Sequence, residues 1–204
     1  MLTDDLSRWS DEDLLTAFCR GQREAFGVLV RRYERELYGY LRRYLGDDYL
    51  ADDVFQNTFL QVYQKAEQYD ASRRVRPWLY TIATNQAVDA LRRQNRHAAI
   101  SLDQTAGESS DGDWRSLLEL LEASGGDPLE HLLSEERRVL VRAAVDQLPD
   151  FLRQVVILAY YQGLKYRDVA NILGIPVGTV KSRLHSALLR LHECWSVSVL
   201  APDR

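Results

Sequence analysis

The chain has 204 residues, of which 46% are hydrophobic and 27% charged, and this composition is typical of a folded protein with one large or two small domains. It contains no apolar run long enough to cross a bilayer, and its acidic N-terminus lacks the apolar core of a signal peptide. We therefore expect no membrane insertion and a cytoplasmic location.

The net charge of −4 hides two segments of opposite sign. Residues 73–96 hold six arginines and one aspartate, whereas residues 97–136 hold ten acidic residues and one arginine. Because salt screens charges beyond about 8–10 Å, the local sign of the charge decides which partners a segment attracts. The basic stretch is therefore compatible with a nucleic-acid partner, although the whole chain is acidic.

Residues 11–45 are predicted to form two helices with apolar faces. Leu14, Leu15 and Phe18 form the first face, and Gly21 ends that helix. In the second helix, apolar and aromatic residues recur at helical spacing over about five turns and form the second face. They are Phe26, Leu29, Val30, Tyr33, Leu37, Tyr40, Leu41 and Tyr44. A helical stripe of aromatic residues is more often core than a ligand pocket, and we interpret this one as core.

Residues 48–69 are predicted to form the next helix, which has one polar face. That face comprises Asp52, Asp53, Gln56 and Asn57. Paired acids can bind metals or act in acid–base chemistry, but no histidine or cysteine joins these two. Two interpretations remain open: a face that docks on another protein, and a solvated helix start whose acids favour the helix dipole.

Residues 70–77 are predicted to form an arginine-rich loop, and residues 78–96 a helix. Tyr69, Trp78 and Tyr80 lie beside this basic segment, together with the amide of Asn85. Single-stranded DNA requires cations for its backbone, and rings or an amide-lined pocket for an unstacked base. The alternative is a core aromatic helix with its arginines in solvent. Residues suited to one helix face recur at helical intervals in this segment, which fits that alternative. They are Trp78, Leu79, Ile82, Ala83, Gln86, Ala87, Ala90 and Leu91.

Residues 97–128 are dominated by Ser, Gly, Asp and Glu and are predicted to form an acidic linker. Asp127 and Pro128 are suited to cap and begin a helix, which we expect over residues 129–147. A further helix is expected over residues 151–162. Gly163 then leads into the last part of the chain.

Residues 164–187 are predicted to form a helix-turn-helix. Gly174 accepts the left-handed conformation that ends the first helix, and Pro176 is tolerated where the second begins. The second helix presents a face without acids, made of Thr179, Lys181, Ser182, Arg183, His185 and Ser186. Such a face fits a DNA major groove, where phosphates attract cations and base edges accept and donate hydrogen bonds. We favour this over an ordinary helical hairpin because the turn glycine, the proline and the acid-free face coincide.

No catalytic or cofactor motif is visible. The sequence has no glycine-rich phosphate loop, no Ser-His-acid pattern and no zinc-ligand spacing, so we expect no enzyme activity, no metal and no cofactor. The expected fold is all-α, with two small helical domains joined by an acidic linker and a helix-turn-helix in the C-terminal one. The expected parts are an N-terminal tail 1–10, a domain 11–96, the linker 97–128, a domain 129–195 and a C-terminal tail 196–204.

Three segments together resemble bacterial sigma factors of the extracytoplasmic-function (ECF) group. They are ADDVFQNTF at residues 51–59, RPWLYTIATNQAVDALRR at residues 76–93, and YRDVANILGIPVGTVKSRLHSA at residues 166–187. The resemblance implies that the first domain (region 2) docks on RNA polymerase core and opens the −10 promoter element, and that the second (region 4) reads the −35 element. It also implies that an anti-sigma protein is a possible partner, besides the polymerase core and promoter DNA.

The resemblance assigns a role to individual residues. Those implied to bind the polymerase are Asp52, Asp53, Gln56, Asn57 and Phe59. Those implied to contact the −10 element are Tyr69, Arg76, Trp78, Asn85, Arg92 and Arg93. Those implied to contact the −35 element are Thr179, Lys181, Ser182, Arg183, His185 and Ser186. The chain departs from the family pattern at Asn57 and Asp168, where Glu is usual, and at Ser186, where Arg is common.

Two other classes of protein remain as alternatives. A helix-turn-helix regulator would bind duplex DNA without docking on core polymerase, but it would leave the first two segments unexplained. An adaptor or anti-sigma-like protein with a vestigial DNA helix would be consistent with Asn57 and Ser186. Binding to DNA that depends on core polymerase distinguishes a sigma factor from the regulator.

Overall fold

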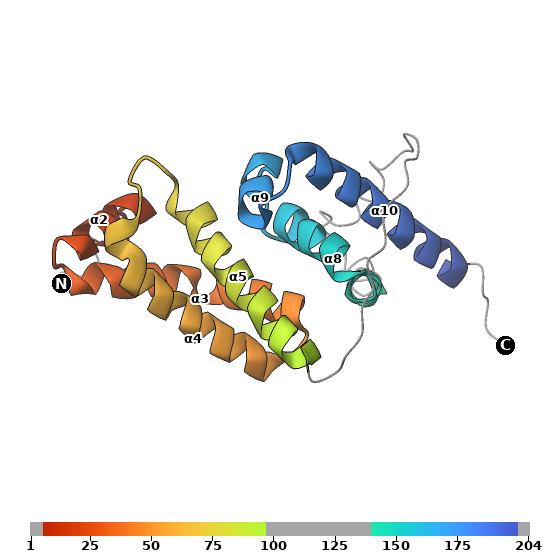
Figure 1. Cartoon of the computed structure of the whole chain (residues 1–204), viewed down its shortest axis with the longest axis horizontal. Helices are drawn as coiled ribbons and strands as arrows, with labels where there is room; N and C mark the ends of the chain where they lie inside the picture. Colours follow the sequence, from red (N-terminus) through yellow and green to blue (C-terminus); the bar gives the residue numbers. More distant parts are fainter. Residues whose placement is uncertain (1–5, 97–139, 200–204) are drawn as a thin grey trace, which may run out of the picture. The chain divides into compact units, whose positions relative to one another are not determined.

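The computed structural model describes residues 6–96 and 140–199 (Figure 1). Every regular element within these ranges is helical, which confirms the all-α prediction. The predicted linker at 97–128 and the predicted start of the second domain at 129 lie outside the described residues. Among the described residues, helices α2 to α5 and α9 belong to one compact unit, and residues 140–163 and α10 belong to another. The domain boundaries stay predictions.

The first unit begins with three helices whose ends are set by local signals. α2 spans Asp11–Cys19, and the side chain of Ser10 caps it by accepting from the N–H of Asp13. α3 spans Arg23–Leu45 and ends at Gly46, whose φ of 70° is left-handed. α4 spans Asp48–Lys65, and the side chain of Asp47 accepts from the N–H of Leu50 at 3.0 Å. The short 3₁₀ helix η1 follows at Ala66–Gln68.

α5 spans Val75–Arg96, and it packs with α3 and α4 in the core of this unit (Figure 1). The predicted aromatic stripe of α3 is confirmed as core, since Leu29, Leu37, Tyr40 and Leu41 are fully buried. The Tyr40 hydroxyl and the Thr84 hydroxyl meet at 2.8 Å, so both buried polar groups are satisfied.

Two expectations for α5 were wrong. The helix begins at Val75 rather than at Trp78, so Pro77 lies inside its first turn. Tyr80, expected beside the basic segment as part of a nucleic-acid surface, is fully buried. Of the eight residues on the apolar spacing, Leu79, Ile82, Ala83 and Ala87 are buried, whereas Trp78, Gln86, Ala90 and Leu91 are half-buried. The helix is therefore turned so that its inner face runs through Val75, Leu79, Ile82, Ala83 and Ala87.

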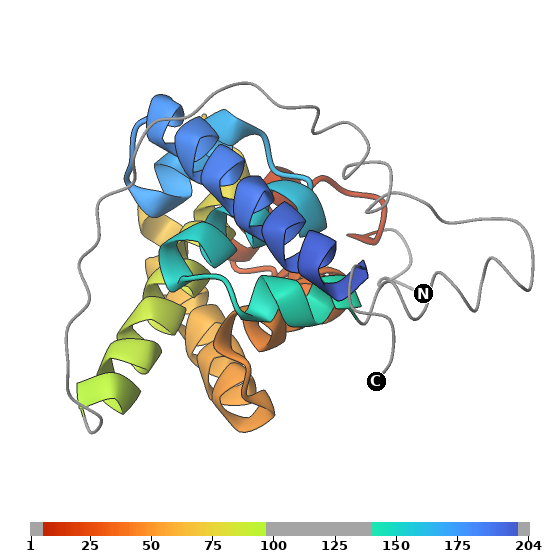
Figure 2. The same cartoon turned by 90° about the vertical axis from the view of Figure 1, so that its right-hand side faces the viewer.

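The second unit contains α8, Asp150–Val156, and α10, Val177–Val199, which lie side by side (Figures 1 and 2). Residues 140–146 are also helical. The single helix predicted for residues 151–162 instead changes to a π-helix, η2, at Ile157–Tyr161. The N–H of Gln162 donates to the carbonyl of Ile157 at 3.0 Å, which is the wider spacing of a π turn.

The turn predicted between the last two helices is confirmed. α9 spans Tyr166–Leu173 and ends at Gly174, whose φ of 65° is left-handed. α10 begins at Val177, one residue after Pro176, whose carbonyl accepts from the N–H of Val180 at 3.1 Å. Val180 and Leu184 are buried as predicted, whereas Leu188 is half-buried. No helix among the described residues has both the length and the apolar character needed to span a membrane.

Candidate functional site

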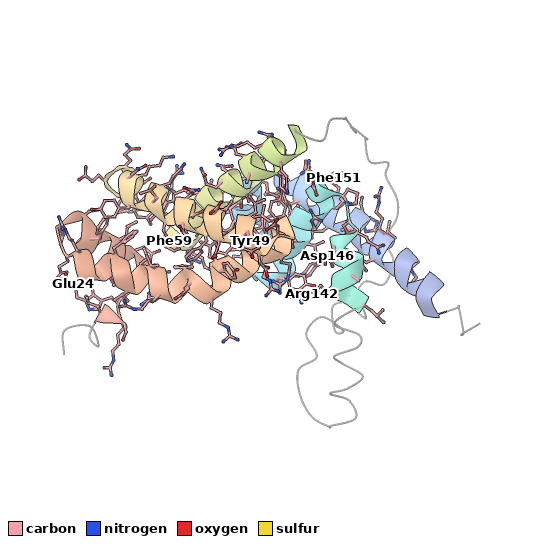
Figure 3. All side chains as sticks on the ribbon, turned by 90° about the horizontal axis from the view of Figure 1, so that it is seen from below. Glu24, Tyr49, Phe59, Arg142, Asp146 and Phe151 are labelled. Carbon is pink, nitrogen blue, oxygen red and sulfur yellow. The ribbon has the colours of Figure 1, made fainter. Side chains whose placement is uncertain are left out.

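The polar face of α4 is exposed to solvent. Asp52, Asp53, Gln56 and Asn57 are all exposed, which fits both the docking face and the solvated helix start. Phe59 differs from them, because only 6% of it is exposed and its ring lies 5.0 Å from Phe55 and 6.2 Å from Phe26 (Figure 3). Phe59 therefore supports the helix from its inner side.

Two exposed apolar side chains extend this face, and the sequence analysis missed both. Tyr49 is 89% exposed at the start of α4, and Leu60 is 55% exposed three turns later. With Asp53, Gln56 and Asn57 they recur at intervals of three and four residues, so all five share one side of the helix. The helical period alone could have found them. Large exposed apolar groups beside carboxylates and amides are suited to bind a protein surface.

An aromatic pair connects the residue after η1, Tyr69, with the first turn of α5, which carries Trp78. The ring centroids of Tyr69 and Trp78 are 4.9 Å apart, with their planes at 50°, and both side chains are half-buried. The Tyr69 hydroxyl donates to the carbonyl of Arg73. Burial, followed by the charges of Glu12 and Asp70, raises the pKa of Tyr69 to about 12. The hydroxyl therefore remains a donor at neutral pH.

The loop between the two rings is held by its own side chains. Oδ1 of Asp70 accepts from the N–H of Ser72 at 3.0 Å and from its hydroxyl at 2.7 Å. Arg73 pairs weakly with Asp70 at 3.4 Å and, like Arg74, remains exposed. These two arginines present positive charge beside the aromatic pair.

Trp78, Asn85 and Arg92 follow one another at seven-residue intervals along α5. Two turns of a helix bring the chain back to nearly the same side, so these three side chains form one stripe of about 21 Å. Asn85 is exposed, and Arg92 is exposed although it pairs with Asp89 at 3.8 Å. Arg93 is exposed next to the stripe. An aromatic pair, an amide and a cation thus succeed one another along one surface.

Arg76 has a different environment from the other predicted −10 residues. Its Nε and Nη2 donate to Oε1 of Glu36 at 3.0 and 2.6 Å, and the Tyr80 hydroxyl donates to the same oxygen at 2.7 Å. Burial lowers the pKa of Arg76, but the hydrogen bond and charge of Glu36 outweigh it and the net shift is upward. Contact between Arg76 and DNA stays a prediction.

The predicted outward face of α10 is only partly exposed. Lys181 and Ser182 are exposed, whereas the other four members, Thr179, Arg183, His185 and Ser186, are half-buried. The guanidinium carbon of Arg183 lies 5.5 Å from the ring centre of Phe151 on α8. Nε2 of His185 is buried and has no hydrogen-bond partner within the described part of the chain. No acid occurs in the first turn of α10, so the face remains suited to DNA phosphates.

The chain matches two family models, Sigma-70 region 2 over residues 29–97 and Sigma-70, region 4 over residues 138–191. It is 31% identical over 182 residues to the RNA polymerase sigma-H factor of Pseudomonas aeruginosa, with 89% of this chain and 92% of the relative covered. It is also 30% identical over 166 residues to the ECF RNA polymerase sigma factor SigW of Bacillus subtilis, with 81% of this chain and 86% of the relative covered. The chain belongs to the ECF group of sigma factors.

Two solved structures share the fold of this ECF sigma factor. CnrH, in complex with the cytosolic domain of CnrY, gives a TM-score of 0.63 at 21% identity and covers 92% of this chain and 97% of its own. The sigma factor RpoE of Bartonella quintana, in complex with the anti-sigma factor NepR, gives a TM-score of 0.58 at 21% identity, with 82% and 94% covered. These two structures show the shared fold, while the family models and the sequence relatives above confirm the sequence-based identification.

As an ECF sigma factor, the chain is a transcription initiation factor that directs promoter-specific transcription. The predicted −10 residues and the polymerase-docking residues lie within or beside the region 2 match, and the predicted −35 residues lie within the region 4 match. Among the described residues, no group of three histidine, cysteine or acidic side chains is arranged to hold a metal.

Proposed function

We propose that this sigma factor opens the −10 element at the aromatic pair of Tyr69 and Trp78 and along the stripe that continues from Trp78 through Asn85 to Arg92. The observation that carries the proposal is the half-buried aromatic pair. An exposed amide, Asn85, and an exposed cation, Arg92, follow Trp78 on the same side of α5. Stacking an unpaired base on an aromatic side chain returns about 1–3 kcal/mol, which offsets the few kcal/mol that unstacking costs. No hydrolysis by this chain is required.

We propose that α10 reads the −35 element while α4 docks on core polymerase. Lys181 and Ser182 are exposed and would approach a phosphate or a base edge, with Arg183 held beside them. The acids, amides and exposed Tyr49 and Leu60 of α4 support a protein-docking role for that helix. In this scheme region 2 is the domain 11–96, region 4 is the domain 129–195, and the linker joins them.

Two further parts of the proposal concern the cell. We place the protein in the cytoplasm, where core polymerase and DNA are found. We also propose an anti-sigma protein as a partner, because the solved relative RpoE of Bartonella quintana is a sigma factor in complex with the anti-sigma factor NepR.

The test is run-off transcription with purified bacterial core polymerase and a library of promoter fragments, with and without this chain. Transcripts that start at fixed sites only when the chain is present are the expected result. Trp78→Ala should abolish strand opening while core binding persists. Strand opening is measured by the fluorescence of 2-aminopurine placed in the −10 strand. Trp9→Ala is the matched control, because Trp9 is 36% exposed and lies outside the stripe. DNA binding without core dependence would instead indicate a duplex-DNA regulator.

A further inference from the structure

The first turn of α5 depends on hydrogen bonds from other helices. A helix start leaves four N–H groups without partners inside the helix, and this turn has no acidic residue of its own to accept from them. The N–H of Val75 donates instead to Oε1 of Glu12 on α2, at 2.9 Å and across 63 residues of sequence. Pro77 contributes no N–H at all. The cap of α5 is therefore a tertiary contact.

A second carboxylate holds the same turn from α3. One oxygen of Glu36, Oε1, accepts from Nε and Nη2 of Arg76 and from the hydroxyl of Tyr80. Tyr80 is fully buried, and hydrogen bonds to a charged acceptor are stronger than neutral ones. Burial first, and the hydrogen bond of Glu36 second, raise the pKa of Tyr80 well above its usual value, so it remains a donor.

Arg76 and Tyr80, which Glu36 holds, flank Trp78 of the aromatic pair in the sequence. Trp78 stands between Arg76 and Tyr80, and its ring faces Tyr69. The charge of Glu12 also reaches Tyr69, where it contributes to the raised pKa of the phenol. Both carboxylates therefore act on the segment that carries the two rings, and neither is placed to stack on a base itself.

We infer that Glu12 and Glu36 are positioning residues for promoter opening: they fix the first turn of α5 so that Tyr69 and Trp78 are in place before DNA arrives. This inference rests on the proposed function of the aromatic pair. A site that is ordered in advance loses less conformational entropy when it captures a base. In this arrangement Arg76 acts through Glu36, as part of the support of the pair.

The experiment measures promoter opening by holoenzyme assembled from core polymerase and the full chain. Glu12→Ala and Glu36→Ala should each form about tenfold fewer open complexes on a promoter with 2-aminopurine in the −10 strand, while core affinity stays at the wild-type value. Glu12→Gln should restore opening, because its amide oxygen accepts from the N–H of Val75 as the carboxylate does. Such rescue would not occur if only the negative charge of Glu12 mattered.

Val62→Ala and Glu34→Ala are the matched controls. Val62 is fully buried in α4, so the first variant lowers the unfolding temperature without touching the turn, and Glu34 is an exposed acid on α3. The inference is overturned if Glu12→Ala and Glu36→Ala open promoters as the wild type does. It is equally overturned if Val62→Ala, at an equal drop in unfolding temperature, loses as much promoter opening as the glutamate variants do.

Trp78→Ala separates this inference from the function on which it rests. If Trp78→Ala opens promoters normally, the role of the aromatic pair fails. If Trp78→Ala is inactive but both glutamate variants are fully active, only the positioning role fails. Should the alanine variants not fold, Glu12→Asp and Glu36→Asp shorten the side chain by one methylene and keep its charge. They should show the same loss of opening, and wild-type opening by both would contradict the inference.

Discussion

The guanidinium carbon of Arg183 on α10 lies 5.5 Å from the ring centre of Phe151 on α8. A cation over an aromatic face is attracted by about 0.5–1 kcal/mol at an exposed site. Both side chains are half-buried, so the ring also restricts the rotamers open to the arginine. Phe151 thereby sets the direction in which the proposed −35 contact of Arg183 points.

Phe151→Leu should weaken −35 binding about threefold, because leucine fills the space but offers no ring to the cation. The slope of affinity against salt should not change, since no charge is removed. The measurement is filter binding of holoenzyme to promoter fragments at several salt concentrations. Phe55→Leu, which alters a half-buried ring on α4, is the control for general loss of aromatic packing. A smaller salt slope in Phe151→Leu would mean that Arg183 had moved away from the phosphates.

Lys181→Ala should behave differently from Phe151→Leu. Lys181 is an exposed cation, and losing one phosphate contact reduces the logarithmic salt slope by about 1 and weakens binding to all sequences alike. Core polymerase binding should stay intact. Lys65→Ala at the end of α4 is the control, because it removes an equal charge outside α10. An equal loss of core binding in Lys181→Ala would show that α10 has been assigned the wrong partner.

The elements that the sequence predicted well are those whose signals are local. Gly174 ends α9 and Asp47 precedes α4, and in each case the deciding residue lies within a turn of the helix end. The periodic stripe of α3 likewise needed no knowledge of distant segments. Three motifs in order then identified the family, because their spacing is more specific than any single helix-turn-helix.

The features that were missed depend on partners far away in the sequence. The true start of α5 is fixed by Glu12, 63 residues from Val75. The burial of Tyr80 and the pairing of Arg76 follow from Glu36, which is more than 40 residues from Tyr80. The sequence around Arg76 gives no sign that its guanidinium donates to Glu36. Only the packing of α2, α3 and α5 reveals that partner.

Asn85→Ala should harm promoter opening more than closed-complex binding. Asn85 is exposed between Trp78 and Arg92 on the proposed stripe, where its amide would meet an unpaired base rather than duplex DNA. We expect the fraction of open complexes, measured by permanganate reactivity of unpaired thymines, to fall about tenfold while closed-complex affinity falls less than twofold. Gln94→Ala removes another exposed amide from α5, on the opposite side, and is the control. Equal losses in both steps would argue against a melting role.

Buried tyrosines make the stability of this protein sensitive to alkaline pH. An unperturbed tyrosine has a pKa of about 10, whereas burial is the first cause that raises the pKa of Tyr69 to about 12 and lifts that of Tyr80 above its usual range. Between these values the unfolded chain releases phenolic protons that the folded chain retains. Releasing these protons lowers the free energy of the unfolded state relative to the folded one, so stability falls as pH rises. The tyrosine contribution is fully present below about pH 10.

We therefore expect the free energy of unfolding, measured by urea titration, to fall steeply above about pH 10. Tyr80→Phe should be less stable than the wild type at pH 8, because it lacks the hydrogen bond to Glu36, yet its stability should decline less steeply above pH 10. Tyr49→Phe, which removes a hydroxyl from a side chain that is 89% exposed, is the control for the Tyr→Phe substitution itself. If Tyr80→Phe kept the full wild-type slope, the phenol of Tyr80 would not be among the groups that hold their protons in the folded state.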